Sequence, residues 1–242
     1  MYGAAYAEIY DLIYASRDKD YAGESAELAA LVRARKPDAA SLLDVACGTG
    51  GHLAHLKQEF GTVAGLEQSE HMIARANRAM PDIPVYQGDM RDFHVERTFD
   101  AVVCMFSSIG YVGSTAALDS TLKSFAHHLN PGGVIIIEPW YFPDGFLPGY
   151  IANDLVRTPD RVTVRVSHST REGDQVPMTV HYIDAQRDAG IKHYTDVHWM
   201  TLFEREQYEA AFEQAGCRVE YLPGGRFNCG LFVGTRTDQP LR

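Results

Sequence analysis

The sequence lacks any long uninterrupted run of apolar residues, and it has no excess of positive charge. A membrane-spanning helix needs roughly 20 consecutive apolar residues, so we expect no membrane segment. The N-terminus shows neither the basic stretch nor the apolar core of a secretory signal.

With 22 Lys and Arg against 32 Asp and Glu, the formal net charge is −10. Such a charge repels nucleic acid and anionic membranes, and we expect neither as a partner.

Cysteine is scarce and never occurs in the Cys-x-x-Cys spacing of zinc sites. Its positions are Cys47, Cys104, Cys217 and Cys229. Scattered thiols of this kind indicate a reducing compartment, so we expect a cytoplasmic protein without disulfides. His52 and His55 lie three residues apart in a predicted helix, but no third ligand at a suitable spacing accompanies them. We therefore predict no metal site.

What the chain does contain is a regular alternation of short apolar runs and helical patterns. The alternation predicts strands at 41–45, 62–66, 85–87, 99–105 and 134–138, and helices at 51–60, 69–79 and 115–129. Apolar strands separated by helices form parallel sheets covered on both faces, so the predicted fold class is α/β and Rossmann-like. Two helices precede this pattern, at 2–15 and 22–36, and a turn is expected at 130–133. A helix at 204–215 and strands at 218–222 and 230–236 follow it.

Between residues 141 and 200 the periodicity changes from that of helices to that of strands. Alternating apolar and polar residues at 162–166, 178–182 and 193–202 predict an antiparallel meander with one solvated face. We expect this meander to be an insertion that forms a substrate region. The predicted division is a Rossmann-like domain of residues 1–140 and 201–242, with the inserted antiparallel β region at 141–200.

The turn after the first predicted strand is rich in glycine, within the stretch LLDVACGTGGH at 42–52. In open α/β sheets, ligands bind beyond the carboxyl ends of the strands. Gly48 and Gly50 allow the backbone to turn tightly and to approach a ligand. The dinucleotide fingerprint Gly-x-Gly-x-x-Gly/Ala is incomplete, because Leu53 occupies its third small position. A P-loop is excluded, since no Gly-Lys-Ser/Thr follows.

This turn and the motifs that follow it resemble the class I S-adenosylmethionine-dependent methyltransferases. The resemblance covers residues 41–138 and includes Glu67 at a strand end, GDMRD at 88–92 and NPGG at 130–133. It implies S-adenosyl-L-methionine as cofactor, with Glu67 on the ribose hydroxyls, Asp89 on the adenine amino group and Tyr21 on the methionine carboxylate. The cofactor-binding residues that it implies are Tyr21, Asp44, Ala46, Gly48, Glu67, Gln68, Asp89, Met90 and Met105.

A narrower resemblance extends from about Tyr10 to Val233 and includes the predicted insertion. FSSIG at 106–110, EPW at 138–140 and SHSTREG at 167–173 resemble the dTDP-amino-deoxysugar N,N-dimethyltransferases of the desosamine and mycaminose type. The resemblance implies transfer of two methyl groups in succession to the amino group of a dTDP-linked amino-deoxysugar in antibiotic biosynthesis. It also implies a homodimer and an N-terminal helical lid.

One position departs from the pattern of these relatives. They lead us to expect an arginine on the nucleotide diphosphate directly before the Gly-Leu-Phe of the last strand, where this chain has Cys229. Arg226 is the nearest candidate to replace it. Arg161 and Lys19 are further candidates for substrate binding, because basic side chains bind phosphate. The other basic residues of the lid and the insertion are Arg17, Arg165 and Arg171.

Methyl transfer to an amine is an in-line displacement, which needs a neutral nucleophile, close alignment and exclusion of water. A sugar amine beside electron-withdrawing oxygens is less basic than lysine, so no dedicated general base is required. The predicted catalytic residues are Tyr111, whose hydroxyl would orient the nucleophile or relay its proton, and Tyr14, which would contact the sugar. Trp140 is expected to form a wall for the sugar or the thymine. For all three side chains, simple packing is the alternative.

Two other functions are compatible with the same residues. A class I methyltransferase acting on an oxygen, or on an amine of another small natural product, would use the same cofactor site. A protein that binds the cofactor without catalysis is disfavoured, because Asp44, Gly48, Glu67 and Asp89 are all present. An amine at C3 and one at C4 of the sugar both fit these motifs, as do one and two transfers.

Overall fold

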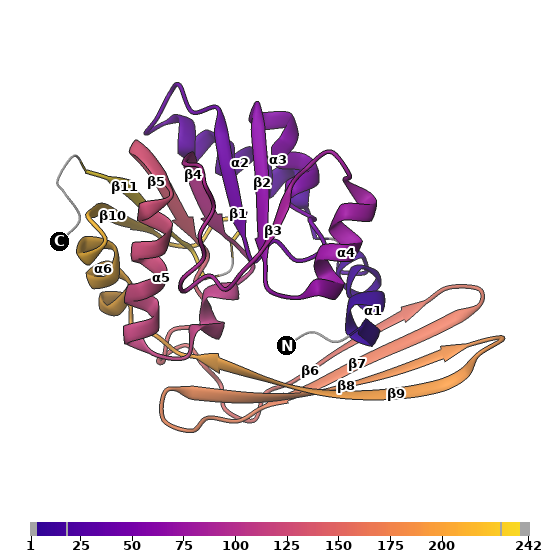
Figure 1. Cartoon of the computed structure of the whole chain (residues 1–242). Helices are drawn as coiled ribbons and strands as arrows, with labels where there is room; N and C mark the ends of the chain where they lie inside the picture. The colour runs from indigo at the N-terminus through magenta and orange to yellow at the C-terminus, as the bar shows by residue number, and fades with distance from the viewer. Residues whose placement is uncertain (1–3, 18, 228, 238–242) are drawn as a thin grey trace.

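The computed structural model describes residues 4–17, 19–227 and 229–237, which form two β-sheets and the helices around them (Figure 1). The larger sheet has seven strands in the order β10-β11-β5-β4-β1-β2-β3. Their bounds are β1 Ser41–Val45, β2 Thr62–Glu67, β3 Val85–Gln87, β4 Phe99–Cys104, β5 Leu129–Ile137, β10 Cys217–Leu222 and β11 Leu231–Arg236. Strands β1 to β5 run parallel, whereas β11 pairs antiparallel with both β5 and β10.

The strand order of this sheet reverses between β1 and β4. The chain first adds β2 and β3 on one side of β1, and then crosses to add β4 and β5 on the other. The carboxyl ends of β1 and β4 therefore form the switch point, at which open α/β sheets bind their ligands. The predicted Rossmann-like class is confirmed by this arrangement.

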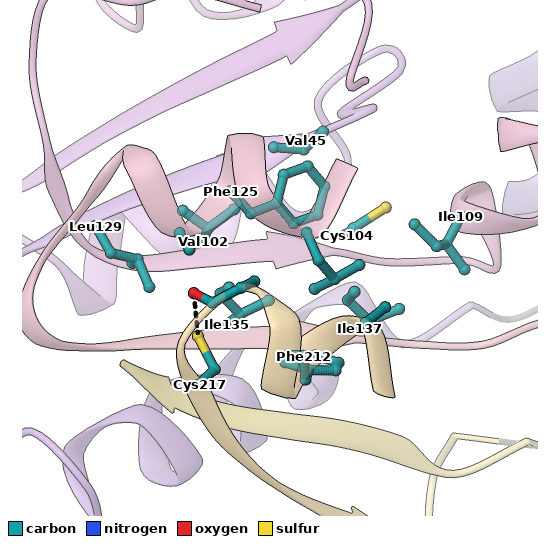
Figure 2. Close-up of a cluster of buried hydrophobic side chains, with 14 of the residues drawn as sticks. Val45, Val102, Cys104, Ile109, Phe125, Leu129, Ile135, Ile137, Phe212 and Cys217 are labelled. Carbon is teal, nitrogen blue, oxygen red and sulfur yellow. Dashed lines mark hydrogen bonds between the residues drawn. The ribbon is translucent and has the colours of Figure 1, made fainter. Parts of the chain in front are cut away.

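Helices cover both faces of the larger sheet, because its central strands are apolar on both sides. Their bounds are α1 Ala4–Ala15, α2 Tyr21–Arg33, α3 Leu53–Glu59, α4 Glu70–Ala79, the 3₁₀ helix η1 Ser108–Val112, α5 Thr115–His127 and α6 Arg205–Gln214. Figure 2 shows the cluster on the side of α5 and α6, where Phe125 and Phe212 pack near Val102 and Ile135. Leu42, Val103 and Ile136 face the other cluster, below α2 and α3. No helix in the described ranges is long and apolar enough to cross a membrane.

The smaller sheet is antiparallel and has the order β6-β7-β8-β9. Its strands are β6 Ile151–Arg157, β7 Arg161–Ser169, β8 Gln175–Gln186 and β9 Gly190–Thr201. It lies across the carboxyl edge of the larger sheet, next to α1 (Figure 1). The antiparallel insertion is thus confirmed, but the prediction of three strands was wrong. The sequence did not predict β6, because its apolar Ile151 and Leu155 point to solvent at the edge of the sheet. The apolar pattern of β6 therefore does not mark a buried face.

The structure also bears on the predictions for residues 130–133 and for the N-terminal helix. Residues 130–133, expected as a turn before a strand, belong to β5 and lie where its register with β4 shifts: Phe99 pairs with Leu129, but Ala101 pairs with Val134. The extra residues are accommodated as an irregularity of the strand, so the predicted separate turn was wrong. The N-terminal helix is present as α1, while residues 2 and 3 of its predicted span lie outside the described residues.

Candidate functional site

A cavity of about 750 Å³ lies between the carboxyl edge of the larger sheet, helix α1 and the inner face of the smaller sheet. A second cavity of about 30 Å³ lies beside it and shares Tyr10, Ala46, Phe106 and Ser108 with it. Of the predicted cofactor residues, those lining the large cavity are Ala46, Gly48, Glu67, Gln68, Asp89 and Met90. Those lining the small cavity, besides the shared Ala46, are Tyr21, Asp44 and Met105. The fold therefore gathers residues from four strand ends around one site.

The glycine turn after β1 has the left-handed backbone that the sequence led us to expect. The φ angles are +59° at Gly48 and +89° at Gly50, and an added Cβ at Gly50 would lie 2.0 Å from the Met80 methyl group. Ala46 is also left-handed, with φ +56°, which is unusual for a residue with a side chain. Strained backbone of this kind is found at ligand sites, because the surrounding structure holds it in place.

Asp44, at the carboxyl end of β1, is buried without a hydrogen-bond partner for its Oδ2 atom among the described residues. Burial, together with the neighbouring Glu67 carboxylate, raises the pKa of Asp44 to about 8. A buried acceptor that is unsatisfied costs free energy until a ligand reaches it. The site at Asp44 therefore favours a ligand that carries positive charge.

Glu67, at the end of β2, is oriented by its own backbone neighbourhood. Its carboxylate accepts hydrogen bonds from the amides of Gly48, Gln68 and Ser69, at 3.0, 2.9 and 2.8 Å. A carboxylate has about four acceptor positions, so capacity remains for a ligand hydroxyl. These bonds join the glycine turn to the end of β2 and hold the carboxylate at the cavity wall.

Asp89, in the loop after β3, is paired with Arg91 and accepts a bond from the Gln68 amide nitrogen at 3.2 Å. The Arg91 guanidinium lowers the pKa of Asp89 below its usual value. Asp89 therefore stays ionised at the cavity edge and can accept a hydrogen bond from a ligand.

Helix α1 is fastened over this site by Asp11, a residue that the sequence did not single out. Asp11 accepts a hydrogen bond from the Thr49 hydroxyl at 2.5 Å and pairs with Arg75 of α4 at 2.6 Å. The same helix presents Tyr14 to the large cavity, where its ring meets Phe106 edge-on at 4.8 Å. α1 thus covers the glycine turn and carries Tyr14 to the place where the two sheets meet.

Tyr111 and Trp140, both predicted at the site, also line the large cavity. Tyr111 lies in η1, and its hydroxyl is 3.0 Å from Nδ1 of His198 in β9. Trp140 follows β5 and contacts Tyr141 and Phe146 with ring centroids 5.6 Å apart in both cases. His198 was missed, because only the packing of the smaller sheet under η1 brings it to the cavity.

Three predicted substrate residues do not line either cavity. Lys19 bonds Glu24 at 2.7 Å and lies 4.4 Å above the Phe106 ring. Arg161 pairs with Asp184 at 2.6 Å, and Arg226 pairs with Asp20 at 2.5 Å. Each of these three side chains is thus engaged with a carboxylate that lines neither cavity.

Two other arginines do reach the large cavity. Arg17 bonds Asp154 through Nε at 2.7 Å and Nη2 at 2.6 Å, and Arg165 lies 3.6 Å from the same carboxylate. Arg165 is buried, on the inner face of β7 beside Ser167 and Ser169, whose positions also line the cavity. With two cations and one carboxylate, this group keeps a net positive charge at the wall formed by the smaller sheet.

Comparison with known proteins places this chain among enzymes with the same two-sheet architecture. Residues 42–133 match the family described as Methyltransferase domain. The chain is 53% identical over 97% of its length to the dTDP-3-amino-3,4,6-trideoxy-alpha-D-glucopyranose N,N-dimethyltransferase of Streptomyces venezuelae, of which it covers 99%.

Solved structures show the same similarity. The crystal structure of DesVI from Streptomyces venezuelae matches with a TM-score of 0.91 at 53% identity, covering 96% of this chain and 98% of that one. CalS10, an amino pentose methyltransferase from Micromonospora echinaspora solved with bound S-adenosylmethionine, matches with a TM-score of 0.86 at 42% identity, covering 95% and 97%.

Proposed function

The chain belongs to the dTDP-amino-sugar N,N-dimethyltransferases, a family of S-adenosylmethionine-dependent enzymes, and we propose that it methylates the amino group of a dTDP-linked amino-deoxysugar twice in succession. One observation carries the proposal. A single cavity extends from the glycine turn and Glu67 to Trp140 and Arg165, and its size and lining support our proposal that it holds the adenosine of the cofactor together with the sugar nucleotide. We propose that the cofactor lies at the strand ends of the larger sheet, and that the substrate lies between α1, η1, Trp140 and the smaller sheet.

The residues at the strand ends fit S-adenosyl-L-methionine. Asp44 offers a buried, unsatisfied acceptor, and Glu67 offers an oriented carboxylate that suits a diol. When bound, the cofactor supplies a methyl group on a sulfonium. We propose that Asp44 holds its positively charged methionine end, Glu67 its ribose hydroxyls and Asp89 its adenine amino group, with Tyr21 and Met105 closing the small cavity.

The remaining cavity residues position the nucleophile and exclude water. Tyr14 from α1 and Tyr111 from η1 both line the cavity, and Phe106 packs beside Tyr14. Alignment of two reactants in this way is worth roughly 7–11 kcal/mol of activation free energy. No strong base is needed, because a neutral sugar amine is itself the nucleophile. We propose that Tyr14 and Tyr111 contact the amino sugar.

The nucleotide end of the substrate requires positive charge and an aromatic wall. Arg17 and Arg165 supply the charge within the cavity, and Trp140 supplies an aromatic face. Arg161, Arg226 and Lys19 are engaged with carboxylates outside both cavities. We therefore propose Arg17 and Arg165 for the diphosphate and Trp140 for the sugar or thymine, and residues 141–200 as the substrate region.

The outer face of the smaller sheet supports a homodimer. Apolar side chains that β6 to β9 expose on this face are Ile151, Leu155, Val166, Ile183, Val197 and Trp199. Exposed apolar side chains gathered on one face are typical of an interface between proteins. We propose that two copies pair through this face.

We also propose that the protein is cytoplasmic and has no nucleic-acid partner. The free cysteines support the first proposal, and the net charge of −10 supports the second.

The proposal is tested by incubating the enzyme with S-adenosyl-L-methionine and a panel of dTDP-3-amino and dTDP-4-amino deoxysugars. Mass spectrometry should show one and then two added methyl groups on at least one member, and that member identifies the amine position. Methylation of a hydroxylated sugar instead, with no gain on any amine, would overturn the assignment to nitrogen.

A further inference from the structure

A tyrosine of η1 and a histidine of the smaller sheet meet at the substrate side of the large cavity. Tyr111 follows β4 in η1, whereas His198 belongs to β9 of the smaller sheet. Their hydroxyl and Nδ1 atoms are 3.0 Å apart, and their rings meet edge-on. The tyrosine is 37% exposed and the histidine 6%, and both line the cavity. The buried histidine thus contacts the hydroxyl of the more exposed tyrosine.

The surroundings of His198 keep its imidazole neutral. Burial lowers its pKa to about 4, the nearby Arg165 acts in the same direction, and Asp196 opposes them. Its Nε2 atom faces the Asp196 carboxylate at 3.8 Å. A neutral imidazole with its proton on Nε2, toward this carboxylate, has an acceptor lone pair on Nδ1. In this tautomer the hydroxyl of Tyr111 donates to Nδ1 of His198.

We propose that Tyr111 and His198 form a positioning pair, in which His198 holds the phenol proton so that the phenol oxygen accepts an N–H of the substrate amine. This inference rests on the proposed function. The direction of the hydrogen bond between Tyr111 and His198 decides whether the lone pair of the substrate nitrogen is free to attack. A phenol proton turned to the amine would engage the nitrogen lone pair that has to attack. With the proton held by His198, the nitrogen lone pair stays directed to the methyl carbon.

The pair acts in both rounds of methylation. In each transfer the nitrogen lone pair forms the N–C bond, the C–S bonding pair returns to sulfur, and the resulting ammonium releases one proton to water before the next attack. The primary amine has two N–H groups that can reach an acceptor, whereas the monomethylated amine has one. Loss of the acceptor therefore affects the second transfer more than the first.

Three variants test the pair: Tyr111→Phe, His198→Leu and His198→Asn. Asn is the conservative change, because its side-chain oxygen can take the place of Nδ1. We expect Tyr111→Phe and His198→Leu to lower kcat about tenfold, the effect of one hydrogen bond of about 1.4 kcal/mol, with KM for the sugar nucleotide changed less than about twofold. Both variants should release more monomethylated product relative to dimethylated product. His198→Asn should keep most of the wild-type rate and a product ratio, monomethylated to dimethylated, close to that of the wild type.

Two further measurements separate positioning from a structural role. The double variant Tyr111→Phe with His198→Leu should be no slower than either single one, because both remove the same interaction. Affinity for S-adenosylhomocysteine, measured by calorimetry, should stay within about twofold of the wild type. His127→Leu, an exposed change on α5, is the matched control and should leave rate and product ratio unaltered.

Rate effects that multiply in the double variant, or an unchanged product ratio in Tyr111→Phe, would overturn the inference. If His198→Leu does not fold, Tyr111→Phe and His198→Asn still decide it through the product ratio. Failure of the proposed function is distinguishable, because wild-type enzyme would then leave every amino sugar of the panel unmethylated.

Discussion

At the scale of single residues, one buried carboxylate governs how the cofactor site responds to pH. Asp44 has a pKa raised to about 8 by burial and by Glu67, from an ordinary value of 3.8. The folded protein therefore prefers this group protonated. Its contribution to stability is full below pH 3.8 and is lost progressively as the pH rises to about 8. A cationic ligand reverses the preference, because it stabilises the ionised form.

We predict that affinity for S-adenosyl-L-methionine rises with pH, by at most about tenfold per unit, and levels off above pH 8. Calorimetry between pH 6 and 9 measures this directly. Asp44→Asn should weaken binding and abolish the slope, whereas Asp89→Asn, at an acid already ionised through Arg91, should keep the slope. A wild-type affinity that is flat over the whole range contradicts the assignment of Asp44.

Arg165 and Arg161 lie on the same strand and provide a matched pair for the diphosphate. We predict that Arg165→Met raises KM for the sugar nucleotide about tenfold or more with little change in kcat, because it removes a cation from the cavity wall. Arg161→Met should leave KM near the wild-type value, since Arg161 pairs with Asp184 outside the cavity. Steady-state kinetics measures KM for the sugar nucleotide in both variants. A larger increase in KM for Arg161→Met than for Arg165→Met would restore the substrate-binding role predicted for Arg161 from the sequence.

At the scale of elements, α1 is held over the glycine turn by an apolar cluster with the smaller sheet and by two polar contacts of Asp11. Ile9 and Ile13 are buried against Val180 and Tyr182 of the smaller sheet, while Asp11 bridges Thr49 and Arg75. The ion pair between Asp11 and Arg75 is partly exposed to solvent and contributes about 0–1 kcal/mol to stability. We propose that α1 opens to admit the cofactor and closes again.

We predict that Asp11→Ala loosens α1 without unfolding the protein. Amide hydrogens of residues 9–14 should exchange faster, and cofactor affinity should fall by about three- to tenfold, while Tm changes by less than about 2 °C. Hydrogen exchange followed by mass spectrometry reports the first effect. Arg33→Ala, which breaks an exposed pair with Glu59 away from the site, is the control and should leave exchange in α1 unchanged.

At the scale of the whole molecule, the smaller sheet has two faces with different roles. Its inner face carries Arg165, Ser167 and His198 to the cavity, and its outer face carries the exposed apolar residues such as Leu155 and Val197. Alternation along each strand separates the two sets. We thus propose that the same sheet binds substrate on one side and pairs subunits on the other.

We predict that Leu155→Lys combined with Val197→Lys converts a dimer to a monomer, because buried lysines without partners oppose association. Sedimentation velocity measures the change in mass. A control with Lys57→Glu, on α3 of the larger sheet, should remain dimeric. A wild-type protein that is monomeric at all concentrations would contradict the proposed interface.

Much of this protein follows from local sequence patterns alone. Apolar runs that end in Asp44 and Glu67, with a glycine turn between, determine the strands, their parallel order and the cofactor edge, because burial on both faces requires such runs. Only the tertiary structure decided which polar residues of the insertion reach the cavity. Arg165 rather than Arg161 lines it, and His198 meets Tyr111, because the way the smaller sheet packs across the larger one selects among residues that share the same face of their strands. Such packing depends on contacts far apart in sequence, which no local pattern records.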